Sequence, residues 1–167
     1  PYDRQREHVW LNPYVGYWTT TYARCILFHY IAKYPELILQ YDTDSLYYIT
    51  EPSQVKLLKT RECTAQELID AFESDLREYS DMMHEKNLRI FKGDKHFLTL
   101  GSWDIDKEDS TGFKGLGAKR YLVRKADGKL KPTVAGMRKS AFVKYIKESG
   151  ADPFEFFSEN MKLDRMK

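Results

Sequence analysis

Two carboxylates stand one residue apart, at Asp42 and Asp44, inside the apolar and aromatic segment LILQYDTDSLYYI at residues 37–49. Side chains alternate along a strand, so residues at i and i+2 would point to the same face. Two acids so close together repel each other unless a cation lies between them, and hard oxygen ligands suit Mg²⁺ or Mn²⁺. Asp, Thr and Ser also form ordinary turns, which leaves a plain surface turn as the alternative. The apolar flanks favour the metal site, because a surface turn has little reason to lie between two buried strands.

Basic residues gather in the second half of the chain. Between Lys114 and Lys147, eleven Lys and Arg residues accompany a single acid, Asp127, whereas residues 51–110 contain fourteen acids and nine bases. A positive lobe suits a polyanionic partner such as nucleic acid, and a solvated Lys-rich surface is the alternative.

The segment at residues 119–125 mixes cations with an aromatic ring, as a strand that follows a phosphate backbone would. Strand alternation predicts that Lys119, Tyr121 and Lys125 share one face and that Arg120 lies on the other.

The secondary-structure pattern predicts an α+β fold for this chain of 167 residues, with an antiparallel sheet packed on helices. Helical spacing and capping residues indicate helices at residues 19–33, 64–84, 140–148 and 153–161. Hairpins are expected at 37–49 and, around the turn sequence ADGK, at 119–125 with 130–134, and a short strand at 97–100.

The helix at residues 19–33 has apolar side chains on most of its faces, so we expect it to be largely buried. Its aromatic residues, and those just before it, are accordingly assigned to the core: Tyr14, Tyr17, Trp18, Tyr22, Phe28 and Tyr30.

Composition narrows the cellular setting. No run approaches the ~18 apolar residues of a membrane span, and no signal peptide is visible. Cys25 and Cys63 are too isolated for a disulfide framework. We therefore expect a cytoplasmic protein without a membrane partner.

The sequence YDTDS at residues 41–45 resembles motif C of the family B DNA polymerases, in which a hairpin of the palm domain presents the two aspartates. Three further segments are similar to the protein-primed branch of that family. They are the helix YVGYWTTTYAR at 14–24, LGSW at 100–103 with the Lys-x-Tyr segment FKGLGAKRYLV at 113–123, and AGM at 135–137 followed by FEFF. The resemblance covers nearly all of residues 14–163.

This resemblance implies a palm-type antiparallel sheet with a small helical C-terminal extension. Residues 1–13 would be a tail or connection, residues 14–139 a portion of the palm, and residues 140–167 the start of a thumb. The implied activity is template-directed nucleotidyl transfer to a primer 3′-hydroxyl, with two Mg²⁺ or Mn²⁺ ions in the complete enzyme. Primer-template DNA and a dNTP would be its partners, with a terminal priming protein as a further candidate. The setting would be a bacterial host cell, with a phage or mobile element encoding the protein.

The resemblance also assigns roles to single residues. Asp44 would be a ligand of the catalytic metals, and Asp42 would lie beside it with a lesser role in metal binding. Lys119 and Tyr121 would hold the primer strand near its 3′ end. Further DNA contacts would come from Arg120 and Lys125, and the hairpin would be shaped by Tyr41, Thr43 and Ser45.

Two signatures of the family are missing. Motif A, an Asp followed shortly by Ser-Leu-Tyr-Pro, would supply the other essential metal ligand, and motif B, a Lys followed by Asn-Ser-x-Tyr-Gly, would contact the nucleotide. The segment NPYVGYW at 12–18 is no substitute for motif B, and no exonuclease region is present. The chain looks like the C-terminal half of a palm without fingers. Alone, we expect it to bind nucleic acid weakly and not to polymerise.

Two alternatives stay open. One is a non-catalytic nucleic-acid-binding module that kept the basic hairpin. The weaker one is a topoisomerase-like metal site, suggested by FKGLG at 113–117, but the chain lacks the longer Asp-rich cluster and the Glu-Gly-Asp-Ser segment of those enzymes.

Overall fold

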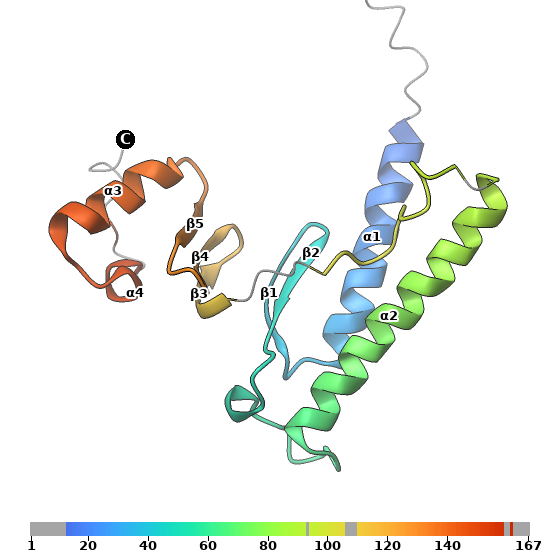
Figure 1. The fold of residues 1–167 in the computed structure, drawn as a ribbon, viewed down its shortest axis with the longest axis horizontal. Coiled ribbons are helices and arrows are strands. Elements are labelled where there is room, and N and C mark those ends of the chain that lie inside the picture. The colour runs from blue at the N-terminus through green and yellow to red at the C-terminus, as the bar shows by residue number, and fades with distance from the viewer. Residues whose placement is uncertain (1–12, 93, 106–109, 159–160, 162–167) are drawn as a thin grey trace, which may run out of the picture. The chain divides into compact units, whose positions relative to one another are not determined.

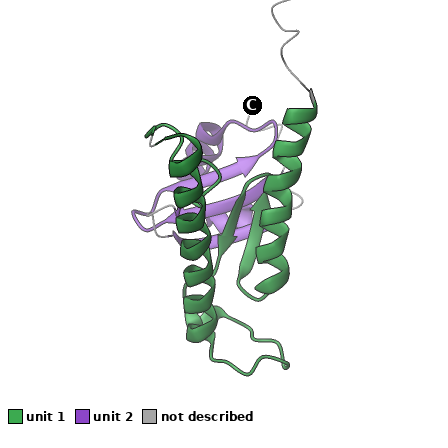
Figure 2. Ribbon diagram, turned by 90° about the vertical axis from the view of Figure 1, so that its right-hand side faces the viewer, with its two compact units in different colours: residues 1–103 green, residues 104–167 purple. Residues whose placement is uncertain are grey.

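The computed structural model describes residues 13–92, 94–105, 110–158 and 161. The chain divides into two compact units, unit 1 at residues 1–103 and unit 2 at residues 104–167 (Figure 2). The described elements are helices and two antiparallel sheets, so the predicted α+β class is confirmed. No helix among the described residues is long and apolar enough to span a membrane.

Unit 1 contains two long helices and a β-hairpin (Figure 1). In chain order its elements are α1 (Pro13–Lys33), β1 (Ile38–Asp42), β2 (Ser45–Tyr48), the short 3-10 helix η2 (Pro52–Gln54) and α2 (Ala65–Ile90).

The core of unit 1 is built from aromatic rings around the fully buried Phe72 of α2. Tyr34, which directly follows α1, and Tyr48 of β2 contact this ring, with centroid distances of 5.1 and 4.8 Å. The other buried members of the cluster are Tyr30, Leu37, Leu68, Ile69 and Leu76. Both helices and the hairpin therefore share one hydrophobic core.

Helix α1 begins earlier than predicted and is far more exposed. It starts at Pro13 rather than near Thr19. The prediction that its aromatic residues form the core was wrong except at Tyr30, which is buried; the exposed ones are Tyr14, Tyr17, Trp18, Tyr22 and Phe28. The apolar residues of α1 lie all around the helix, so no stripe marks which part is covered. The buried residues of the helix begin only at Leu27, in its second half.

Helix α2 begins with the predicted capping box. Thr64 Oγ1 accepts a hydrogen bond from Glu67 N at 3.2 Å, and Glu67 Oε2 accepts one from Thr64 N at 2.7 Å. The helix continues to Ile90, two turns beyond the predicted end.

The segment after α2 forms turns, so the predicted short strand at residues 97–100 was wrong. The carbonyls of Leu98 and Leu100 accept hydrogen bonds from the buried Asn87 Nδ2 of α2, at 3.0 and 2.8 Å. Because the Asn87 side chain satisfies these two carbonyls, they need no hydrogen bonds from a neighbouring strand.

Unit 2 contains a three-stranded antiparallel sheet in the order β3-β4-β5 and two short helices. Its elements are β3 (Ser110–Gly117), β4 (Arg120–Lys125), β5 (Leu130–Val134), α3 (Lys139–Ser149) and α4 (Pro153–Phe156). The hairpin around ADGK and the helix that ends before the left-handed Gly150 are confirmed. Within the described residues, the last helix ends well before the predicted residue 161.

Strand β3 was not predicted, because three of its eight residues are glycines and glycine is depleted in strands. The structure explains one of them. A Cβ atom at Gly112 would lie 2.9 Å from the ring of Phe154, so α4 approaches the strand too closely for a side chain.

One face of this sheet packs on α3 and α4. Leu122 of β4, Phe142 of α3 and Phe157 are fully buried in one cluster. On the same face, the Arg124 guanidinium lies 4.6 Å from the ring centroid of Phe154. Unit 2 therefore has a hydrophobic core of its own.

Candidate functional site

The predicted motif C segment forms the tip of the hairpin β1–β2. Asp42, the last residue of β1, pairs with Ser45, the first residue of β2. Thr43 and Asp44 are thus the two residues of the turn. The predicted hairpin at residues 37–49 is confirmed, and Asp-Thr-Asp-Ser forms its tip.

The base of the hairpin is fixed to the core of unit 1. Leu37 is fully buried, and its carbonyl accepts a hydrogen bond from Ile49 N at 2.9 Å, which closes the two strands. Ile38, Leu46 and Tyr48 pack against the buried cluster. The strands are therefore held by packing and the turn is left at the free end.

An ion pair fixes the connection from α1 to β1. Arg61 Nε donates to Glu36 Oε1 at 2.8 Å, and its Nη2 donates to the carbonyl of Lys33, in the last turn of α1, at 2.6 Å. The Glu36 side chain is only 2% exposed, and its hydrogen bond with Arg61 lowers the pKa of its carboxyl. The hairpin therefore starts from a rigid point.

The register assigns the hairpin residues to two faces, because directly paired residues in antiparallel strands share a face. Tyr41 pairs with Leu46, which packs on the core, and the Tyr41 ring meets Phe28 of α1 edge to face at 5.8 Å. Tyr41 thus braces the hairpin against α1. The pair Asp42 and Ser45 lies on the other face.

The two aspartates have different surroundings. Asp42 is half-buried, and its Oδ1 accepts hydrogen bonds from Thr43 N at 2.8 Å and Thr43 Oγ1 at 3.2 Å. Asp44 is exposed, and its carboxylate has no hydrogen bond or ion pair with any other described residue. Asp44 lies in the turn and not in a strand, so strand alternation does not determine its direction. The expectation that both carboxylates share a face stays a prediction.

The donor set at the hairpin tip suits Mg²⁺ or Mn²⁺ but is incomplete. Mg²⁺ commonly binds through one or two carboxylates, keeps several waters and takes further oxygens from substrate phosphates. Asp42 and Asp44 could supply such carboxylates. Among the residues that the structure describes, no group of three or more His, Cys, Asp or Glu side chains could hold a metal. The tip therefore provides part of a metal site.

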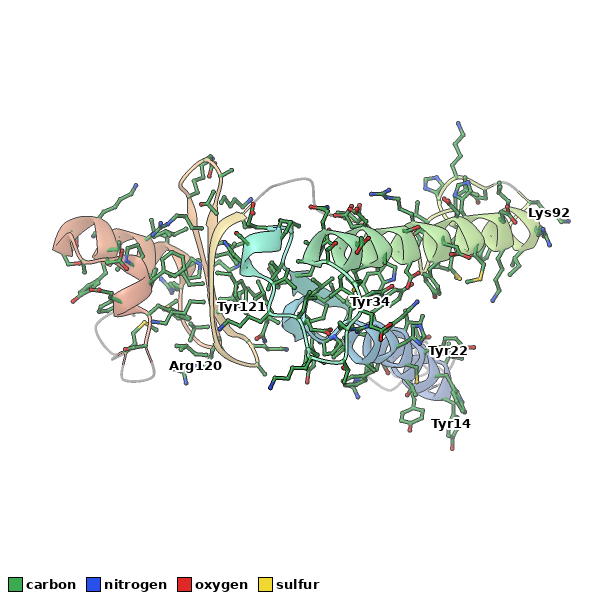
Figure 3. All side chains as sticks on the ribbon, turned by 90° about the horizontal axis from the view of Figure 1, so that it is seen from below. Tyr14, Tyr22, Tyr34, Lys92, Arg120 and Tyr121 are labelled. Atoms are coloured by element: carbon green, nitrogen blue, oxygen red, sulfur yellow. The ribbon has the colours of Figure 1, made fainter. Side chains whose placement is uncertain are left out.

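The predicted DNA-binding residues lie on the β3–β4 hairpin of unit 2. Lys119 is in the turn with φ of 55°, and β4 begins only at Arg120. Lys119 is exposed, while Arg120 and Lys125 are half-buried at the two ends of β4 (Figure 3 labels Arg120). The predicted strand was one residue too long, because Lys119 lies outside β4. Strand alternation therefore places Tyr121 and Lys125 on one face but does not determine the direction of Lys119.

Tyr121 is the most buried of the predicted DNA contacts. Its side chain is 8% exposed, and its ring stacks on Phe113 of β3 with centroids 6.0 Å apart. Tyr121 thus contributes to the packing of the sheet, and its predicted contact with a primer strand stays a prediction.

The structure brings the predicted residues together in two sets. Tyr41, Asp42, Thr43, Asp44 and Ser45 form the tip of the β1–β2 hairpin in unit 1. The other four form or flank the β3–β4 turn and strand β4 in unit 2, namely Lys119, Arg120, Tyr121 and Lys125.

Sequence reasoning missed the exposed aromatic surface on the first half of α1. Tyr14, Tyr17, Trp18 and Tyr22 have exposed fractions from 62% to 72%, and Tyr14 and Tyr22 are labelled in Figure 3. The one signal in the sequence was the lack of a polar face on this helix, and that signal is equally typical of a buried helix.

No protein-family model matches the chain, and neither curated protein sequences nor solved structures give a match.

Proposed function

We propose that this chain is part of a DNA-directed DNA polymerase similar to the protein-primed branch of family B. The β1–β2 hairpin would present Asp44, with Asp42 beside it, to the catalytic metal ions. In the complete enzyme, these ions would activate the primer 3′-hydroxyl and stabilise the charge of the triphosphate. The β3–β4 hairpin would contact the primer strand through Lys119.

The observation that carries this proposal is the placement of Asp-Thr-Asp-Ser at the tip of a hairpin whose base is fixed in an aromatic core. The packing of Leu37, Leu46 and Tyr48 holds the two strands in place. A metal-binding tip requires such support, because its carboxylates must keep their position while charge develops on the substrate.

The two aspartates would then act differently. Asp42 is oriented by the two hydrogen bonds that it accepts from Thr43. It would therefore hold the geometry of the turn and place its negative charge close to the metal ions. Asp44 is exposed and would be the direct ligand. Removing the Asp44 charge should therefore cost more activity than removing the Asp42 charge.

Primer extension tests this proposal. The protein is expressed from its complete open reading frame and assayed with primer-template DNA, dNTPs and Mg²⁺ or Mn²⁺. Asp44→Asn should lower the extension rate by about a thousandfold, because a lost metal ligand removes several kcal/mol of transition-state stabilisation. Primer-template binding, measured by fluorescence anisotropy, should change little.

The matched control is Asp70→Asn, an exposed acid on α2 whose carboxylate accepts a hydrogen bond only from Gln66 among the described residues. This variant should extend primers at the unmodified rate. Equal rates for Asp44→Asn and the unmodified protein would contradict the proposal. Robust synthesis by residues 1–167 alone would refute the expectation that another metal ligand is required.

A second candidate is the non-catalytic nucleic-acid-binding module. It is favoured by the lack of a third acidic, His or Cys ligand among the described residues. In that case Lys119→Glu would weaken DNA binding and lower its salt dependence, whereas Asp44→Asn would leave every measured property unchanged.

A further inference from the structure

Charge is distributed unevenly along α2. Its first seventeen residues contain six acids and the single base Arg77. The remaining nine residues contain the bases Lys86 and Arg89 and the single acid Glu85. The helix dipole favours this order only within the first and last turns. It does not explain Glu78 and Asp81, which are more than three turns from the start of the helix.

One exposed stripe of the helix carries this polarity. Glu78, Met82, Lys86 and Arg89 follow at helical spacing and are all exposed, with Met82 at 52%. A shallow hollow of about 270 Å³ lies on the basic half of the stripe. Its lining residues are Met82, Glu85, Lys86, Arg89 and Ile90.

The stripe is self-complementary about Met82. Glu78 and Lys86 lie four residues before and after it, so a second helix running antiparallel would place Glu78 of each copy opposite Lys86 of the other. Met82 would meet its own equivalent on the two-fold axis. Such an isologous contact is the usual geometry of a homodimer.

We propose that this stripe of α2 binds a second copy of the same chain as an antiparallel helix pair. The inference is independent of the proposed polymerase function, because it uses none of the residues of the two hairpins.

Other partners fit the stripe less well. A nucleic acid would be attracted by Lys86 and Arg89 but repelled by Glu78, Asp81 and Glu85 on the same outer side of the helix. An acidic protein segment would leave Glu78 without a cation. Within the described part of the chain, neither Glu78 nor Lys86 has an ion pair, so both remain available to a second copy.

The association should be reversible and sensitive to salt. Exposed ion pairs contribute little singly, and screening weakens them further. Sedimentation velocity of the 167-residue chain should therefore show a monomer–dimer equilibrium. The equilibrium should shift towards monomer as NaCl is raised from about 50 to about 500 mM, because the Debye length falls over this range from more than about 10 Å to less than about 8 Å.

Charge exchange gives the decisive comparison. Glu78→Lys and Lys86→Glu should each raise the dimer Kd by about tenfold or more, since like charges would then face each other twice. The double variant carrying both changes should restore the dimer. The matched controls Glu62→Lys and Lys95→Glu, exposed residues away from the stripe, should leave the Kd unchanged. A monomer at all concentrations, or a double variant that fails to recover, would overturn the proposal.

Cross-linking tests the position of the axis. In a Cys25→Ser, Cys63→Ala background, Met82→Cys should form a disulfide-linked dimer on mild oxidation, whereas Asp70→Cys on another face of α2 should not. Equal cross-linking at both positions would refute the antiparallel arrangement. Monomeric protein whose DNA binding is weakened by Lys86→Glu would assign the stripe to nucleic acid and also overturn the proposal.

Discussion

At the scale of single residues, the two aspartates of the hairpin tip show what a short motif can predict. Their types and spacing indicated a turn with a possible cation site, and the structure confirms the turn. The difference in hydrogen bonding and exposure between the two aspartates was not predictable. It depends on the position of Thr43, whose backbone and hydroxyl both donate to Asp42 while Asp44 stays exposed.

A second acid, Asp75 of α2, links the two helices of unit 1. Its carboxylate accepts hydrogen bonds from Lys33 and, at 2.6 Å, from the hydroxyl of Tyr34. Burial raises the pKa of Asp75, but the hydrogen bonds from Lys33 and Tyr34 outweigh it, and the pKa falls below its ordinary value. Folding therefore favours the ionised carboxylate.

This shift predicts an acid-sensitive contribution to stability. A carboxyl whose pKa is lower in the folded state stabilises the protein above its unfolded pKa and loses this effect as the pH falls through the folded value. Asp75→Asn should cost about 1 kcal/mol at pH 7, a value discounted because Lys33 is half exposed. Urea unfolding should show this difference at pH 7 and a smaller one as the pH falls below about 4. A difference that is constant with pH would contradict the assigned ionisation.

At the scale of elements, the local signals with a direct physical cause were reliable. The capping box at Thr64 and the Asp-Gly turn before β5 each satisfy backbone groups within a few residues, so the sequence alone contains the necessary information. The exposure of α1 and the glycine-rich strand β3 depend on what packs against them. Gly112, for example, is required by Phe154, which lies far along the chain.

The segment after α2 should depend on one buried side chain. Asn87→Ala removes both hydrogen bonds to the carbonyls of Leu98 and Leu100 and leaves these groups without their partner. We expect a loss of roughly 2 kcal/mol in the free energy of unfolding of unit 1. Hydrogen exchange of peptides covering residues 94–101 should become faster, while the exposed control Ser74→Ala changes neither property. Unaltered exchange in Asn87→Ala would show that the turns are held by other contacts.

At the scale of the whole molecule, the residues that the structure describes form two hydrophobic cores, one centred on Phe72 and one on Phe142. The sequence indicated the class of the fold but not this division, because the helix and strand patterns are the same whether elements share one core or two. The predicted site residues follow the same division, with the acidic hairpin in unit 1 and the basic hairpin in unit 2.

Separate cores predict separate responses to core substitutions. Phe72→Leu and Phe142→Leu each replace a fully buried ring and should cost about 1–2 kcal/mol in the unit concerned. Hydrogen exchange should therefore accelerate in residues 65–90 for Phe72→Leu and in residues 120–149 for Phe142→Leu. If both variants accelerated exchange equally throughout the chain, the two units would unfold as one.

The proposed polymerase function depends on cation binding at the hairpin tip, which paramagnetic NMR measures directly. Trace Mn²⁺ added to the ¹⁵N-labelled chain should broaden the amide signals of Thr43, Asp44 and Ser45 first, and Asp44→Asn should abolish this effect while Asp70→Asn leaves it intact. Broadening that begins at the acidic half of α2, or that persists at the tip in Asp44→Asn, would contradict the assignment of the hairpin as a metal site.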